Sequence, residues 1–168
     1  SRLLREVKLR KAAERRIRYV ATHDELTGLP NRNLLSDRMQ QAILQHQRGN
    51  KAFCVMFLDL DGFKAINDEY GHNVGDQVLI DFVYQCHQAL NDDILFARIG
   101  GEEFALYVAT DDADKLRATC EQLLSLANNV MVTPSKTLSV SVGSAIKRAT
   151  ETFSNTMKRA DQALYLAK

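Results

Sequence analysis

Two apolar segments, joined by two glycines and two acids, constrain the fold of this 168-residue chain more than any other feature. Residues 94–97 and 104–109 are apolar, and Gly-Gly-Glu-Glu occupies residues 100–103 between them. Apolar runs joined by a short glycine-containing turn predict a β-hairpin with both carboxylates at its turn. Adjacent side chains of a strand point to opposite faces, so the sequence leaves open which of Glu102 and Glu103 faces a ligand.

A second acidic segment ends a strand earlier in the chain. Residues 53–60 are almost continuously apolar, which predicts a central strand covered on both faces. A carboxylate at the C-terminal end of such a strand lies at the rim of the sheet, where ligands bind. We therefore assign Asp59 to a divalent cation and Asp61 to the N-cap of a short helix. If this strand end meets the hairpin, the acids form a Mg²⁺ site suited to phosphate chemistry.

Residues after this strand suit a nucleotide. The backbone N–H groups of Gly62 and Phe63 open a helix and predict a phosphate cradle, beside which Lys64 would neutralise a transferring phosphate. Asn67 supplies an amide and Asp76 a carboxylate, the donor and acceptor that a guanine edge requires. We expect Asp76 in the first turn of its helix. Each residue alone also suits a capping or solvated role, and their grouping favours the ligand.

The hydrophobic periodicity predicts an alternation of helices and strands. Helices are expected at 2–21, 32–47, 64–70, 73–90, 111–128 and from 153 onward, and strands at 53–60, on both sides of the glycine turn and at 138–142. Helices alternating with a single sheet predict a two-layer α/β or α+β sandwich.

The first helix differs from the rest of the chain in charge. Residues 1–20 carry eight Lys and Arg against two acids, whereas the remainder carries 14 against 19 and the whole chain has a net charge of +1. An apolar stripe includes Leu9, Ile17 and Val20. A solvated helix fits the charges, but a dimerising linker fits both charges and stripe, so we favour the linker. Nucleic acid is not expected as a partner, because no aromatic residues interleave with the charges.

Cysteine usage and hydropathy suggest where such a chain resides. The three cysteines are far apart, lie in apolar segments and show no metal or redox spacing. We therefore expect reduced core residues in a cytoplasmic protein. No apolar run is long enough to insert in a bilayer, and no signal peptide is present. The chain begins and ends inside helical patterns, so we expect it to be part of a longer protein, which could be membrane-anchored elsewhere.

Taken together, the motifs resemble the GGDEF domain, the catalytic module of bacterial diguanylate cyclases, with glutamate in the third position of the name motif at 100–104. Other segments resemble the opening turn, the first strand and phosphate loop, the guanine segment, the last strand and the last helix of the family; they are 24–32, 57–68, 71–76, 138–143 and 158–168. Several ordered motifs are more specific than any one of them. The resemblance covers 22–168 and leaves 1–21 as a helical stalk.

The resemblance implies an α+β, palm-like nucleotidyl-cyclase fold with a central, mostly antiparallel sheet flanked by helices and preceded by the stalk helix. It implies condensation of two GTP into cyclic di-GMP with release of pyrophosphate, by two domains facing each other in a homodimer and with Mg²⁺, or Mn²⁺, as cofactor. It also implies an upstream sensor domain. The implied site residues are Asp59, the Leu60 carbonyl, Glu102 and Glu103 for metal; Glu102, Glu103 and Lys64 for catalysis; and Gly62, Phe63, Asn67, His72, Asp76, Leu26, Leu79 and Lys168 for GTP.

Two departures from the family pattern stand out. The family's Arg-x-x-Asp product-inhibition motif matches Asn91 and Ile94 here, so we expect no working inhibition site. The chain ends at Lys168, before a segment in which the family places a phosphate-binding arginine, so we expect weaker binding of GTP.

Three other functions compete with the cyclase. A catalytically silent module that binds GTP or cyclic di-GMP is the main alternative, and the retained acids Asp59, Glu102 and Glu103 argue against it. A cyclase with an adenine product is disfavoured by Asp76, because adenine lacks the N–H pair that a carboxylate accepts. A pure dimerisation domain leaves the acidic residues unexplained.

Overall fold

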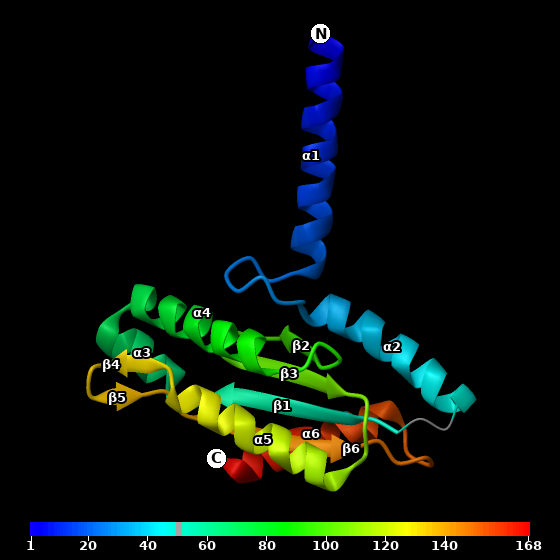
Figure 1. The fold of residues 1–168 in the computed structure, drawn as a ribbon, viewed down its shortest axis with the longest axis vertical. Helices are drawn as coiled ribbons and strands as arrows, with labels where there is room; N and C mark the ends of the chain where they lie inside the picture. Colours follow the sequence, from blue (N-terminus) through cyan, green and yellow to red (C-terminus); the bar gives the residue numbers. More distant parts are fainter. Residues whose placement is uncertain (50–51) are drawn as a thin grey trace.

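Four antiparallel strands form the centre of the molecule in the computed structural model, which describes residues 1–49 and 52–168, apart from the side chain of His46 (Figure 1). Their order is β2 (Leu95–Arg98), β3 (Glu103–Val108), β1 (Cys54–Leu60), β6 (Val140–Ile146). Each neighbouring pair is antiparallel. The structure thus confirms the antiparallel sheet, the hairpin and the buried central strand, since every residue of β1 is buried.

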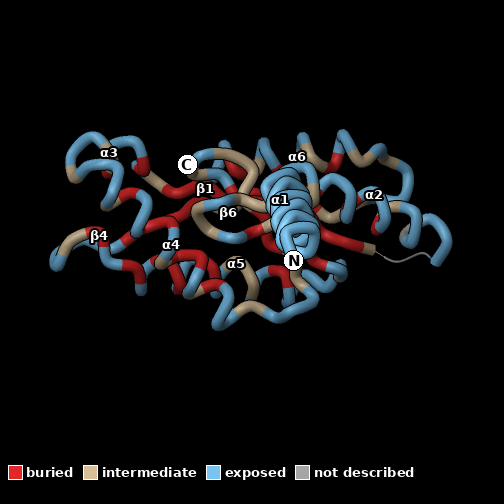
Figure 2. Tube along the Cα trace, turned by 90° about the horizontal axis from the view of Figure 1, so that it is seen from above, coloured by how far each residue is buried: buried red, intermediate tan, exposed pale blue. Residues whose placement is uncertain are grey.

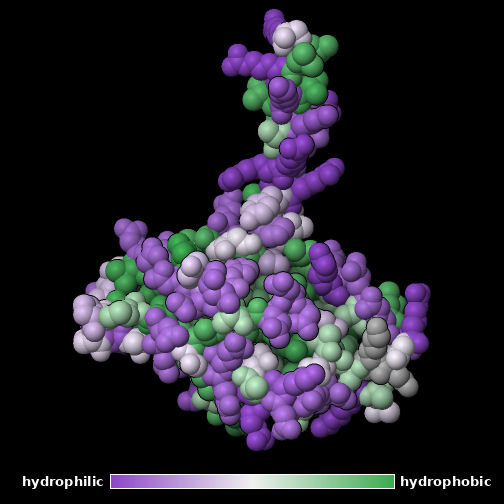
Figure 3. Space-filling view, viewed as in Figure 1, coloured by the Kyte–Doolittle hydropathy of each residue, from purple (hydrophilic) through white to green (hydrophobic). Residues whose placement is uncertain are grey.

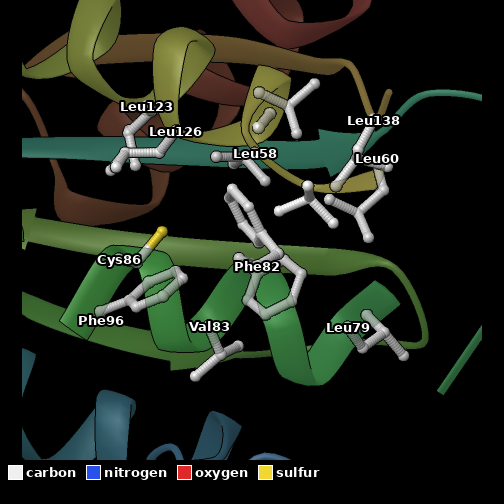
Figure 4. Packing of buried hydrophobic residues seen from close by; sticks show 14 of the residues in the cluster. Leu58, Leu60, Leu79, Phe82, Val83, Cys86, Phe96, Leu123, Leu126 and Leu138 are labelled. Atoms are coloured by element: carbon white, nitrogen blue, oxygen red, sulfur yellow. The ribbon is translucent and has the colours of Figure 1, made fainter. Parts of the chain in front are cut away.

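Helices cover both faces of this sheet, so the molecule has three layers and the predicted two-layer sandwich is wrong. Met56 and Leu58 of β1 point into a core with α4 (His72–Ala89) and α5 (Ala113–Asn128). In Figure 4, Phe82 of α4 lies on the side of the helix that faces the sheet, among the side chains of that core. Val55 and Phe57 point the other way, against α2 (Arg32–Gly49) and α6 (Phe153–Ala167). Because β1 is apolar on both faces, both must be covered.

The remaining elements are short. Helix α3 (Phe63–Tyr70) follows β1 directly, as predicted. A two-stranded hairpin of β4 (Met131–Thr133) and β5 (Lys136–Thr137) was not predicted, because strands of three and two residues are too short to show alternation. The strand predicted at 138–142 begins later, at Val140, and continues to Ile146.

Helix α1 (Arg2–Thr22) extends away from the other elements and confirms the helix predicted at 2–21. None of its residues is buried, and it is seen end-on in Figure 2 as an exposed coil. Apolar side chains remain exposed on it, including Leu3, Leu9 and Ile17. Figure 3 shows green, hydrophobic patches among hydrophilic residues on this helix. Among the described residues, no helix combines the length and the hydropathy needed to cross a membrane.

The cysteines lie in or beside the core, as predicted. Cys54 and Cys86 are buried, Cys120 is partly buried, and all three are free thiols. Burial raises the pKa of Cys54 and of Cys86 to about 12, so both thiols stay protonated at neutral pH.

Candidate active site

Asp59 is the buried acid at the C-terminal end of β1. The strand register pairs it with Glu103 of β3 on one side and with Ser141 of β6 on the other. Only 6% of Asp59 is exposed. Its Oδ2 atom forms an ion pair with the ammonium of Lys168, at the end of α6, whereas Oδ1 is buried without a hydrogen-bond partner among the described residues. A buried carboxylate oxygen without a donor is costly, so this atom suits a ligand that arrives from outside.

The glycine hairpin brings Glu102 to the same end of β1. The Glu102 carbonyl accepts a hydrogen bond from the Leu60 N–H at 3.1 Å. The hydrogen bond to Asp59 raises the pKa of the Lys168 ammonium, and the negative charges of Asp61 and Glu102 nearby add to this rise. The two strand ends therefore converge, as the sequence analysis expected.

The structure separates the two glutamates of the hairpin. Glu103 is exposed, and its side chain folds over Gly100, where an added Cβ would lie 2.9 Å from Oε2 of Glu103. It lines a pocket of about 380 Å³ between α2 and α6, whose polar rim includes Arg32, Lys158 and Asp161. Glu102, not Glu103, therefore lies with the acids around Lys168.

The donor atoms at this end of β1 suit a magnesium ion. In the ranges 1–49 and 52–168, no three acidic, imidazole or thiol side chains come together as a complete metal site. Magnesium does not require one, because it commonly binds one or two carboxylates and completes its coordination with water and substrate phosphates. Asp59 with its free oxygen, the adjacent Leu60 carbonyl and Glu102 fit such a site.

Gly62 opens the helix that was expected to hold phosphate. Its φ of 65° is left-handed, a conformation that favours glycine, and no side chain caps α3. The N–H groups at the start of α3 therefore remain free of a side-chain acceptor. Phe63 is buried and anchors this first turn, and Lys64 is exposed beside it.

The prediction that Asp61 caps this helix is wrong. Its carboxylate instead accepts hydrogen bonds from the hydroxyls of Ser139, at 2.9 Å, and Ser141, at 2.7 Å. Asp61 also donates its N–H to the Ser139 carbonyl at 2.9 Å. Sequence reasoning missed both serines as site residues, because their alternation with valine indicated only a half-buried strand.

Asn67 of α3 packs against α4, where the guanine segment begins. Its Oδ1 atom is buried without a partner among the described residues, and a Cβ added at Gly75 would lie 1.8 Å from it. Only glycine at position 75 leaves room for this amide. His72 is the exposed first residue of α4. Asp76 is exposed too, but α4 begins at His72, so the prediction that Asp76 lies in the first turn is wrong.

Two leucines expected beside the base have different environments. Leu79 is 1% exposed and belongs to the core, and Leu26 is partly buried against that core. Their contact with a base stays a prediction.

A charged link that the sequence analysis missed joins the base of α1 to the hairpin. Arg98 donates to both carboxylate oxygens of Asp24, at 3.0 and 3.1 Å, and to the carbonyls of Gly100 and Gly101. Burial would raise the pKa of Asp24, but hydrogen bonds from Thr27 and Arg98 outweigh it and lower that pKa. The segment that follows α1 is therefore tied to the turn that carries Glu102.

Comparison with known proteins places this geometry in one family. Residues 21–168 match the family model described as "Diguanylate cyclase, GGDEF domain". Two relatives come from Pseudomonas aeruginosa. The bifunctional diguanylate cyclase/cyclic di-GMP phosphodiesterase MucR is 38% identical over 93% of this chain and 23% of its own length, and the diguanylate cyclase TpbB is 34% identical over 89% of this chain and 36% of its own. The chain thus spans about a quarter to a third of these relatives.

A solved structure has the same arrangement of elements. The coiled coil and GGDEF domain of DgcB from Caulobacter crescentus, in complex with c-di-GMP, matches 96% of this chain and 88% of its own with a TM-score of 0.85 and 30% identity. The match extends over the palm-like α+β domain and most of the N-terminal helix.

Proposed function

Because the chain belongs to the GGDEF domain family of diguanylate cyclases, we propose that it condenses two molecules of GTP into cyclic di-GMP and releases two pyrophosphates. The convergence of Asp59, Glu102 and Lys168 at one end of β1 carries this proposal, because it joins acids for a cation to an ammonium for phosphate. A silent binding module would not require this grouping.

Each residue then has a role in positioning or charge neutralisation. Asp59, the Leu60 carbonyl and Glu102 would hold Mg²⁺ or Mn²⁺, with Glu103 toward a second ion; the bound cation supplies Lewis-acid stabilisation of phosphate charge. Glu102 accepts the proton of the ribose 3′-hydroxyl as the 3′-oxygen bonds to the α-phosphorus of the other nucleotide and pyrophosphate leaves. Lys64 and Lys168 neutralise phosphate charge.

The nucleotide is held at both ends. The free N–H groups that begin α3, at Gly62 and Phe63, bind the phosphates. The Asn67 amide and the Asp76 carboxylate recognise guanine, with His72, Leu26 and Leu79 around the nucleotide.

Catalysis requires two copies of the domain. One site holds one GTP, so each 3′-hydroxyl must be aligned with a nucleotide in a facing domain, which is catalysis by proximity. The exposed apolar side chains of α1 suit a dimerising stalk, and the link from Asp24 to Arg98 would transmit the alignment of the stalk to the hairpin. We place the chain inside a longer cytoplasmic signalling protein, downstream of a sensor.

The test is an assay of the chain with GTP and Mg²⁺ over a range of protein concentrations. Cyclic di-GMP, separated by chromatography, is expected to form at a rate that rises more steeply than linearly with protein. The Glu102→Gln variant should lose about 10²- to 10⁴-fold in rate, the usual contribution of a general base. Glu121→Gln, on the exposed face of α5, makes the same charge change and should retain activity. GTP binding without any product, in a folded protein at high concentration, would favour the silent module.

A further inference from the structure

The ammonium of Lys168 occupies the position where a cation would bind. It pairs with Asp59 Oδ2, and Asp61 and Glu102 add to the negative field around it. Helix α6 brings it there because α6 packs along β6 and β1, with Ala160 and Leu164 buried against the sheet. Figure 1 shows the C-terminal end of α6 on the side of the molecule where β1 ends.

The acids around Lys168 differ in what else stabilises them. Asp61 already accepts hydrogen bonds from two serine hydroxyls. Asp59 has no such donor among the described residues, and its side chain is 8% exposed. An ionised carboxylate so deeply buried needs a positive partner. Lys168 therefore supplies the countercharge of Asp59 in the empty protein.

We propose that Lys168 is an internal counter-ion that excludes the divalent cation from Asp59 until a nucleoside triphosphate is bound. Without nucleotide, a cation that binds Asp59 must displace the Lys168 ammonium. The ammonium then loses its ion pair, because the cation occupies the carboxylates around it. With nucleotide, the phosphates offer oxygen atoms to the ammonium, and Asp59 becomes free for the cation. Cation and nucleotide thus bind with positive coupling, which is reciprocal by thermodynamic necessity. This inference rests on the proposed GTP site and adds the order in which its charges exchange.

The test measures cation binding without turnover. The Mn²⁺ affinity of the full chain is measured by electron paramagnetic resonance, with and without 3′-deoxy-GTP, which lacks the reacting hydroxyl. In the wild type, the protein should bind Mn²⁺ more tightly when the nucleotide is present. The gain in affinity should exceed the affinity of the free nucleotide for Mn²⁺ in solution. Lys168→Met, which keeps the length of the side chain and removes its charge, should strengthen nucleotide-free Mn²⁺ binding by about tenfold, within the usual range of coupling between sites.

Two variants make this result specific. Lys115→Met removes the same charge from an exposed lysine of α5, outside the site, and should leave nucleotide-free Mn²⁺ binding unchanged. Lys168→Arg keeps the charge and should behave as the wild type. Unchanged or weaker nucleotide-free Mn²⁺ binding in Lys168→Met, relative to Lys115→Met, overturns the inference.

The proposed function fails separately from this inference. If Lys168→Met gains Mn²⁺ affinity but the wild type does not bind 3′-deoxy-GTP, then Lys168 is the counter-ion and the GTP site is wrong. If the wild type binds the nucleotide and Mn²⁺ independently, the counter-ion role is wrong and the GTP site stands.

Discussion

Asp61 fixes the loop between β1 and α3 through hydrogen bonds to a strand that is distant in sequence. Ser141 is 7% exposed and donates to Asp61 Oδ1, while Ser139 is exposed and donates to Oδ2. Gly62 follows Asp61 in a left-handed conformation and is the N-cap of α3, whose first N–H groups have no side-chain acceptor. The hydroxyl of Ser141 therefore positions the turn that we propose to bind phosphate.

Replacing Ser141 by alanine removes the buried donor of this network. The Asp61 carboxylate is partly buried and keeps the hydrogen bond from Ser139. A hydrogen bond to a charged group contributes about 1.5–3 kcal/mol, so the free energy of unfolding should fall by about that amount or less. The KM for GTP should rise several-fold with a smaller change in kcat, because the turn shifts and the reacting groups do not. Steady-state kinetics and urea unfolding measure both effects.

Two variants of the same strand control for this change. Ser141→Thr keeps the hydroxyl and should have the wild-type KM for GTP. Ser144→Ala, an exposed position of β6, should change neither KM nor stability. A fall in kcat at constant KM in Ser141→Ala would contradict a positioning role.

Local chemistry was predictable where both partners are close in sequence. Asn31, a residue type that favours N-caps, accepts a hydrogen bond from the Leu34 N–H at 3.1 Å at the start of α2. Asp61 was mistaken for such a cap because its partners are distant in the sequence: Ser141 lies on β6 and Ser139 just before it. The ion pair of Asp24 with Arg98 was not predicted for the same reason, because the sequence does not show which distant guanidinium a carboxylate in a turn will contact.

At the scale of elements, α6 matters because it brings Lys168 to Asp59. Its first half is fastened by Glu151, which precedes the helix and accepts hydrogen bonds from Arg159, the Arg148 N–H and the Thr156 hydroxyl. Arg159 in turn donates to the Ile146 carbonyl at the end of β6. Hydrogen bonds from Arg159 and the Arg148 N–H lower the pKa of Glu151 to about 2. This cluster ties α6 to the sheet.

The lowered pKa of Glu151 predicts a loss of stability in acid. A carboxyl whose pKa falls from 4.5 to about 2 on folding stabilises the native state fully above pH 4.5. That contribution disappears as the pH falls from 4.5 toward 2, because the unfolded state then binds the proton more readily. The midpoint of thermal unfolding should decrease across this range. Glu151→Gln should unfold at a lower temperature than the wild type near neutral pH. Its unfolding midpoint should also decrease less between pH 4.5 and 2.

The exposed Glu121 of α5 provides the comparison, and Glu121→Gln should keep the acid dependence of the wild type. An equally steep decrease in Glu151→Gln would show that other carboxyls dominate.

At the scale of the whole molecule, the arrangement of elements was less predictable than their existence. The apolar sequence of β1 indicated that other elements pack on both faces of the sheet. The alternation of helices and strands nevertheless predicted two layers, whereas the structure has three. Periodicity describes one element at a time, whereas strand order depends on which faces pair across the chain. The convergence of the two acidic strand ends was suggested by the resemblance to a family and by the rule for strand ends. The register of β1 with β3 pairs Asp59 with Glu103 and places Glu102 beside Leu60.

The distribution of charge over the molecule bears on control by product. Outside residues 1–20 the chain carries 14 basic and 19 acidic residues, so the GGDEF domain is acidic. Asn91 and Ile94 occupy the turn before β2, where the Ile94 N–H donates to the Asn91 carbonyl at 3.1 Å. A hollow of about 320 Å³ beside this turn is lined by Asp92 and Asp93, with Arg38 of α2 opposite. This surface has no paired arginine and aspartate at positions 91 and 94 to hold an anionic dinucleotide.

We therefore expect synthesis to continue as product accumulates. Cyclic di-GMP carries two negative charges, and an acidic surface disfavours it unless an arginine pairs with its phosphate. Adding cyclic di-GMP to the wild-type reaction should leave the initial rate unchanged at concentrations well below those at which it competes with GTP. Asn91→Arg supplies the missing guanidinium and should strengthen product binding in calorimetry. Inhibition of the wild type that Asn91→Ala relieves, with no change in KM for GTP, would show that the turn at residue 91 still binds product.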